Sequence, residues 1–147
     1  MDYNRIVELI LDVGEEMLKS GAENFRLEDS LYRMCKSYGF KRYDVYAIPS
    51  NLQITVETPE GEMITQIRQI ESTDIDFDRL DYLNNLSRYI CKNTPSVEEI
   101  RKNYDEVMNR RPLPGYLRLM ATILGGVGLG VYFGCDLPDT LVGTVIR

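Results

Sequence analysis

The side chains best suited to bind a small charged molecule lie at two expected turns and on one expected strand. Glu23 and Arg26 follow the turn sequence Ser20-Gly21-Ala22, and a hydroxyl stands beside an amide at Ser50-Asn51. Arg68 supplies a second guanidinium group, whose planar fork can hold a carboxylate through two hydrogen bonds. We therefore predict that Glu23, Arg26, Ser50, Asn51 and Arg68 bind a small charged molecule.

The same residues also have structural interpretations. Ser20–Glu23 fits the end of one helix and the start of the next, where an acid interacts favourably with the helix dipole. Glu23 and Arg26 are three residues apart, so they could pair with each other on a helix. Ser50-Asn51 after a proline is common turn chemistry, and Arg68 could be solvent-exposed or paired with a nearby acid.

A further polar group falls on a segment that already carries a full apolar stripe. We predict that Asn85, Ser87 and Arg88 mainly make interhelical hydrogen bonds, with a functional role as the alternative. Gly21 is assigned to the tight corner between the first two helices, because glycine is the usual residue just past a helix end.

Composition excludes several kinds of chemistry. The 147 residues contain no histidine, which rules out Ser-His-Asp and Cys-His catalysis within the chain. Three cysteines without a Cys-x-x-Cys pair form neither a disulfide framework nor a zinc site, and fit a reducing compartment. The acids at 74, 76 and 78 resemble the start of a calcium loop, but Arg79 stands where glycine is required. We therefore predict no catalytic residues, no metal and no cofactor.

The net charge of the chain excludes a further class of partner. The formal charge of −6 is unlike that of a nucleic-acid-binding domain, which usually shows a basic face, so we expect no nucleic-acid partner.

The glycines at 128 and 130 resemble half of a dinucleotide-binding loop, but the spacing of the full motif fails, so we do not predict a dinucleotide site.

The apolar spacing predicts the elements that must position these residues. Apolar residues recur at helical spacing before Gly21 and before Gly39, and they then alternate with polar residues as in strands. A Ser-x-x-Glu capping box, which marks the start of a helix, begins at Ser96. The expected fold is α+β in the order ααβββαα, with a three-stranded, mainly antiparallel sheet covered by helices. We assign residues 1–111 to this domain, and the expected elements are helices over 6–18, 27–38, 77–90 and 97–107 and strands over 43–48, 52–56 and 63–70.

The remaining residues, 112–147, differ in composition. No charged residue occurs from Leu119 to Cys135, and glycines recur every fourth residue at Gly126, Gly130 and Gly134. A helix over 116–135 would be about 30 Å long, the thickness of a bilayer core, and its glycines would let another helix approach closely. We therefore predict a linker, a transmembrane helix over 116–135, and a truncated second apolar segment over 139–147.

The charges on either side of this segment predict its orientation. Arg110, Arg111 and Arg118 precede the uncharged stretch, whereas Asp136 and Asp139 follow it. By the positive-inside rule, the N-terminal domain would be cytoplasmic and the protein would lie in the cell membrane.

Three stretches give the chain a family resemblance. They are Met17–Glu23 with Arg26, Pro49–Thr55, and the region from Arg68 through the acidic loop to Asn85–Arg88. In this order and spacing the sequence resembles the threonine/serine exporter family, which includes split exporters of small dicarboxylates. The resemblance implies a cytoplasmic domain followed by a membrane bundle that exports small molecules, driven by an ion gradient. It also implies that the charged and polar residues singled out above bind the substrate or gate its passage, namely Glu23, Arg26, Ser50, Asn51 and Arg68.

The resemblance also implies partners. Because nearly all of the family's bundle is absent from the sequence, we expect the chain to need the remaining bundle or a small membrane subunit, and to be unable to transport alone. A homo-oligomer is left open. The alternative is a soluble α+β ligand-binding or regulatory module whose glycine-rich C-terminal segment is buried.

Overall fold

The computed structural model describes residues 1–111 and 114–132. The chain divides into two compact units, Met1–Arg110 and Arg111–Arg147. The first unit is α+β, and its elements follow the order expected from the sequence periods: α1 (Tyr3–Lys19), α2 (Asn24–Ser37), β1 (Arg42–Ile48), β2 (Asn51–Glu57), β3 (Met63–Gln69), α3 (Phe77–Asn93) and α4 (Val97–Met108).

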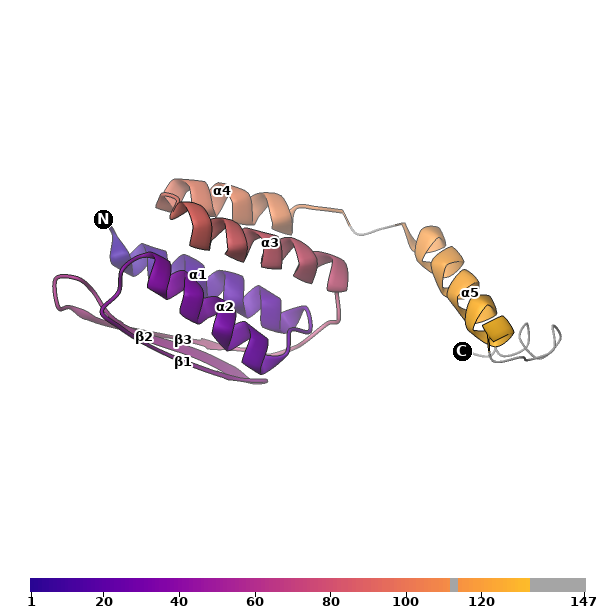
Figure 1. The fold of residues 1–147 in the computed structure, drawn as a ribbon, viewed down its shortest axis with the longest axis horizontal. Helices are drawn as coiled ribbons and strands as arrows, with labels where there is room; N and C mark the ends of the chain where they lie inside the picture. The colour runs from indigo at the N-terminus through magenta and orange to yellow at the C-terminus, as the bar shows by residue number, and fades with distance from the viewer. Residues whose placement is uncertain (112–113, 133–147) are drawn as a thin grey trace. The chain divides into compact units, whose positions relative to one another are not determined.

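The sheet is fully antiparallel and has the order β1-β2-β3. In the register Ile54 pairs with Val45 on one side and with Gln66 on the other. Leu52, Ile54 and Val56 alternate with more exposed residues along β2, so one face of the sheet is buried. Helices α1 and α2 cover that face, and α3 and α4 form a further layer over them (Figure 1).

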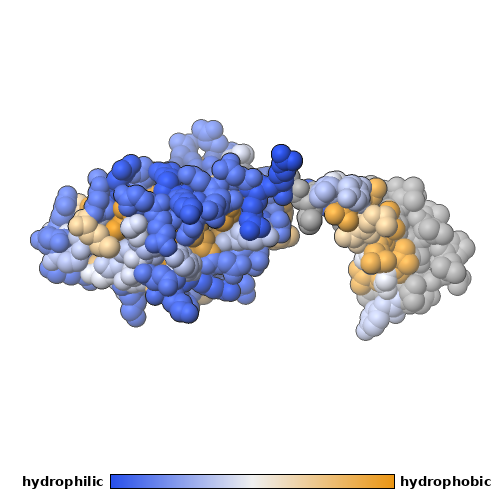
Figure 2. Space-filling view, turned by 90° about the horizontal axis from the view of Figure 1, so that it is seen from above, coloured by the Kyte–Doolittle hydropathy of each residue, from blue (hydrophilic) through white to orange (hydrophobic). Residues whose placement is uncertain are grey.

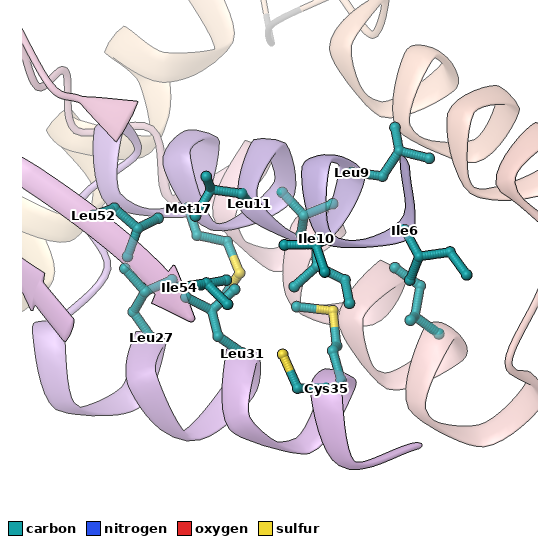
Figure 3. Close-up of a cluster of buried hydrophobic side chains, with 14 of the residues drawn as sticks. Ile6, Leu9, Ile10, Leu11, Met17, Leu27, Leu31, Cys35, Leu52 and Ile54 are labelled. Carbon is teal, nitrogen blue, oxygen red and sulfur yellow. The ribbon is translucent and has the colours of Figure 1, made fainter. Parts of the chain in front are cut away.

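Helix α1 is the centre of the core. It contacts the sheet and the other three helices of the unit, and its buried residues include Ile6, Ile10 and Met17 (Figure 3). Gly14 permits its close approach to α2 and β2, because a Cβ there would lie 2.8 Å from Leu31 Cδ2. The sequence pattern showed only one apolar stripe, but a helix in a middle layer is buried on more than one side.

Local capping fixes where the helices begin. The Asp2, Asp76 and Ser96 side chains accept hydrogen bonds from the backbone N–H groups of Arg5, Arg79 and Glu99, respectively. The acidic stretch before α3 thus supplies a helix cap at Asp76. At Ser96 the Glu99 carboxylate does not complete the capping box in the described contacts but accepts a hydrogen bond from the Tyr89 hydroxyl.

The second unit corrects the membrane prediction. Helix α5 (Gly115–Tyr132) has 18 residues, and no helix in the described residues is long and apolar enough to cross a membrane. The predicted transmembrane helix over 116–135 is therefore wrong. Five glycines and Arg118 lower the hydropathy of α5, although the absence of charge after Leu119 suggested a span.

Parts of the same prediction lie outside the described residues, namely Gly134, residues 133–135 and the second apolar segment over 139–147. Gly126 and Gly130 belong to α5. Within its own unit, α5 has mostly exposed large apolar side chains (Figure 2). They are Leu117, Leu119, Met120, Ile123, Leu124 and Leu129.

Candidate functional site

A groove with a volume of about 790 Å³ runs along α2 and α3. These two helices pack against each other and run in the same direction, so their N-terminal ends lie at one end of the groove (Figure 1). Phe25 and Phe77 line that end and are exposed by 76% and 69%. A volume of this size is typical of small-molecule sites.

Four basic residues and two acids line the groove, although the chain as a whole is acidic. Arg33 Nε lies 2.9 Å from Asp29 Oδ2, which is a close ion pair, whereas Arg26 Nε lies 3.9 Å from Glu23 Oε2. The other two basic residues are Arg88 and Lys92. Neither has an ion pair within the described part of the chain, so the groove keeps an excess of positive charge.

The groove brings together several residues predicted from the sequence. Gly21, Glu23 and Arg26 line it from the start of α2, and Ser87 and Arg88 line it from α3. Gly21 has φ of +96°, a backbone conformation that favours glycine, as expected for the corner between α1 and α2.

Asn85 and Ser87 were expected to form hydrogen bonds to another helix, but the bonds that the structure describes for them are within α3. The Ser87 hydroxyl donates to the Asn84 carbonyl, and the Asn85 amide donates to Asp81, so both bonds stay within α3. Of these two side chains only Ser87 lines the groove, where it is 5% exposed.

Ser50 and Asn51 lie away from the groove, Ser50 in the turn between β1 and β2 and Asn51 at the first position of β2. The Ser50 carbonyl accepts a hydrogen bond from the Ile70 N–H at 2.9 Å, and Asn51 pairs with Ile48 and Gln69 in the sheet register. Their backbone therefore joins the two hairpins, which agrees with the structural interpretation of these residues.

Arg68 is paired rather than free. Its Nη2 lies 3.0 Å from Asp12 Oδ1 and its Nε lies 3.5 Å from Glu15 Oε2. Arg101 also approaches Asp12, at 4.0 Å. Burial raises the pKa of the Asp12 carboxyl, and the Arg68 hydrogen bond and charge oppose this shift only in part. Within the described residues, this guanidinium therefore joins α1 to β3 instead of standing open to a carboxylate ligand.

A network of charges continues along α1. Lys19 Nζ lies 2.6 Å from Glu15 Oε1 and 3.1 Å from Glu16 Oε1, and Arg79 Nη1 lies 3.9 Å from Glu16 Oε2. In the sequence, Glu15 and Glu16 lie between the apolar positions Val13 and Met17, so they belong to the polar face of the helix. Basic side chains from β3, α3 and α4 partly cover them, which the sequence alone could not indicate.

Sequence reasoning missed the residues that complete the groove, namely Phe25, Arg33, Phe77 and Lys92. A signal for them was present, because Arg26 and Arg33 are two helical turns apart and Arg88 and Lys92 are one turn apart. That spacing shows a shared helix face, but only the packing of α2 against α3 makes the two faces adjacent.

Comparison with known proteins gives one family. The model of the family described as "Putative threonine/serine exporter" (ThrE) matches residues 8–146, which is nearly the whole chain. No curated protein and no solved structure gives a significant match.

Proposed function

Because the chain belongs to the threonine/serine exporter family, we propose that it takes part in the export of threonine and serine, with small dicarboxylates as the alternative cargo. In this proposal an ion gradient drives export, and the Met1–Arg110 unit faces the cytoplasm. The chain acts with a membrane-embedded bundle or a small membrane subunit. The family match is the observation that carries the proposal, and it points to transport rather than to an enzyme.

The N-terminal end of the groove is the proposed contact with cargo. A free amino acid carries a carboxylate and an ammonium group, and Arg26 and Glu23 offer the two complementary charges. Their side chains are exposed by 85% and 74% and lie 3.9 Å apart. An exposed pair of this kind contributes little stability, so a ligand can replace it at small cost.

The presence of Glu23 favours an amino acid over a dicarboxylate. A dicarboxylate would place a second negative charge near this carboxylate, whereas the ammonium of threonine would pair with it. Arg68, Ser50 and Asn51 are not included in this contact, because they lie elsewhere in the unit and Arg68 is already paired.

Calorimetric titration of the full chain with L-threonine, L-serine and succinate tests the contact. Glu23→Gln and Arg26→Gln should each weaken threonine binding about tenfold or more, because each removes one charged partner. Arg42→Gln and Asp44→Asn are the matched controls, since they remove an exposed ion pair on β1 outside the groove.

Threonine binding that survives both groove variants would refute the proposed contact. Export is measured separately, as threonine released by cells that express the chain together with its membrane partner. Release that is unaffected by loss of the chain would refute the proposed function itself.

A further inference from the structure

The groove has a second end that the proposed cargo contact does not use. Arg33 lies seven residues beyond Arg26 on α2, which corresponds to about 10 Å along the helix. Arg88 and Lys92 line the groove from α3 and are one helical turn apart. We call Arg33, Arg88 and Lys92 the basic end of the groove.

The charge at the basic end is not balanced by the protein. Asp29 lies 2.9 Å from Arg33, but Arg88 and Lys92 have no carboxylate partner within the described residues. Three positive charges against one acid leave a local charge of +2. By contrast, two other basic side chains each lie close to two acids of α1. They are Lys19 of α1 itself and Arg68 of β3.

Cys91 lies in the same groove as these charges. Its thiol lines the groove and is half-buried, and burial raises its pKa. The charge of Arg33 lowers this pKa and that of Asp29 raises it, so side chains of α2 act on a thiol of α3.

The ligand that matches this charge is a dianion. A zwitterionic amino acid has no net charge and would leave the excess uncompensated, whereas a phosphate group carries a charge of about −1.5 to −2 near neutral pH. Arginine guanidinium groups form paired hydrogen bonds to phosphate, and lysine adds a point charge. We propose that the basic end of the groove binds phosphate, either as the free ion or as the phosphate group of a small metabolite.

The exposed aromatic residues at the other end distinguish these two sources. Phe25 and Phe77 line the same groove, so a nucleotide whose base contacts these rings could also reach the basic end with its phosphates. Inorganic phosphate would use the basic end alone. AMP or ATP binding more tightly than inorganic phosphate therefore indicates a nucleotide.

Titration calorimetry of the full chain with inorganic phosphate, AMP, ATP and succinate tests the proposal. The double variant Arg88→Gln and Lys92→Gln should weaken phosphate binding by about tenfold or more for each cation removed. The double variant Lys36→Gln and Lys102→Gln makes the same change in net charge at exposed residues that do not contribute to the basic end, and should bind phosphate as the wild type does.

Alkylation of Cys91, followed by peptide mass mapping, locates the ligand. Bound phosphate should slow the reaction, because a dianion beside the thiol disfavours the thiolate and shields it. Three results would overturn the proposal: no phosphate binding, equal losses in the two double variants, or an alkylation rate that phosphate does not change. Binding of succinate without binding of phosphate would also overturn it, in favour of a carboxylate site.

These results are separable from the test of threonine binding. The cargo contact uses Glu23 and Arg26, and both residues remain unchanged in the variants of the basic end. Failure of phosphate binding therefore does not count against the proposed threonine contact, and failure of threonine binding does not count against the phosphate site.

Discussion

Replacement of Arg68 by methionine should destabilise the Met1–Arg110 unit by about 2 kcal/mol. Arg68 joins β3 to α1 through Asp12 at 3.0 Å and Glu15 at 3.5 Å. Methionine keeps much of the aliphatic stem, so the change mainly removes the charge and its hydrogen bond.

The magnitude follows from the geometry. A hydrogen bond between charged groups contributes about 1.5–3 kcal/mol, and a fully exposed ion pair contributes about 0–1 kcal/mol. The Arg68 side chain is 28% exposed and its two acids are each 19% exposed, which favours the first range. Asp12 keeps Arg101 only at 4.0 Å, so little of the loss is recovered.

Urea unfolding of the full chain, followed by far-ultraviolet circular dichroism, measures the change. Arg42→Met is the matched control, because its partner Asp44 is at a similar distance, 2.9 Å, but both side chains are more than half exposed. We expect the control to change the free energy of unfolding by less than about 0.5 kcal/mol. Equal losses in the two variants would show that the partial burial of Arg68 adds nothing and would refute the reasoning.

Three further outcomes are expected from the packing and charges of the same unit. Gly14→Ala should lower stability by about 1 kcal/mol, because crowding against Leu31 outweighs the better helix propensity of alanine, and a rise in the melting temperature would contradict this. Tyr38→Phe should cost about 1–2 kcal/mol in urea unfolding, because the buried Tyr38 hydroxyl donates to the Pro95 carbonyl at 2.7 Å, and an unchanged midpoint would count against that bond. Burial raises the pKa of Asp12 above its ordinary value of 3.8, so the folded state holds this proton more tightly than the unfolded state and stability falls as the pH rises through the interval above 3.8. Asp12→Asn should remove that contribution to the pH profile, and a profile identical to the wild type would refute it.

The elements of the first unit could be predicted from sequence because their signals are local. Alternation of Leu52, Ile54 and Val56 requires one buried sheet face, and Ser96 marks the start of α4 because its side chain caps that helix. Interactions across the fold leave no such signal. Arg68 and Asp12 are 56 positions apart, and no local pattern indicates which acid a strand arginine will reach.

The membrane prediction failed for a related reason. Absence of charge from Leu119 to Cys135 does not measure hydrophobicity, because glycine is uncharged without being strongly apolar. Helix α5 includes five glycines and Arg118. The length of an uncharged stretch and its transfer free energy are separate quantities, and only the second decides whether a helix can cross a bilayer.

The position of the groove in an acidic chain bears on what it can bind. A net charge of −6 repels anions at long range, and salt screens this repulsion over about 8–10 Å. The local excess of positive charge at Arg33, Arg88 and Lys92 acts only at shorter distances, because these side chains are exposed and salt screens their charges as well. An anion that binds there must therefore be recognised by direct contacts, since the field of the whole chain does not attract it. If both proposals hold, selectivity between a zwitterion at Glu23 and Arg26 and a dianion at the basic end follows from local charge, because the first site offers one acid beside one base and the second has two bases without an acidic partner among the described residues.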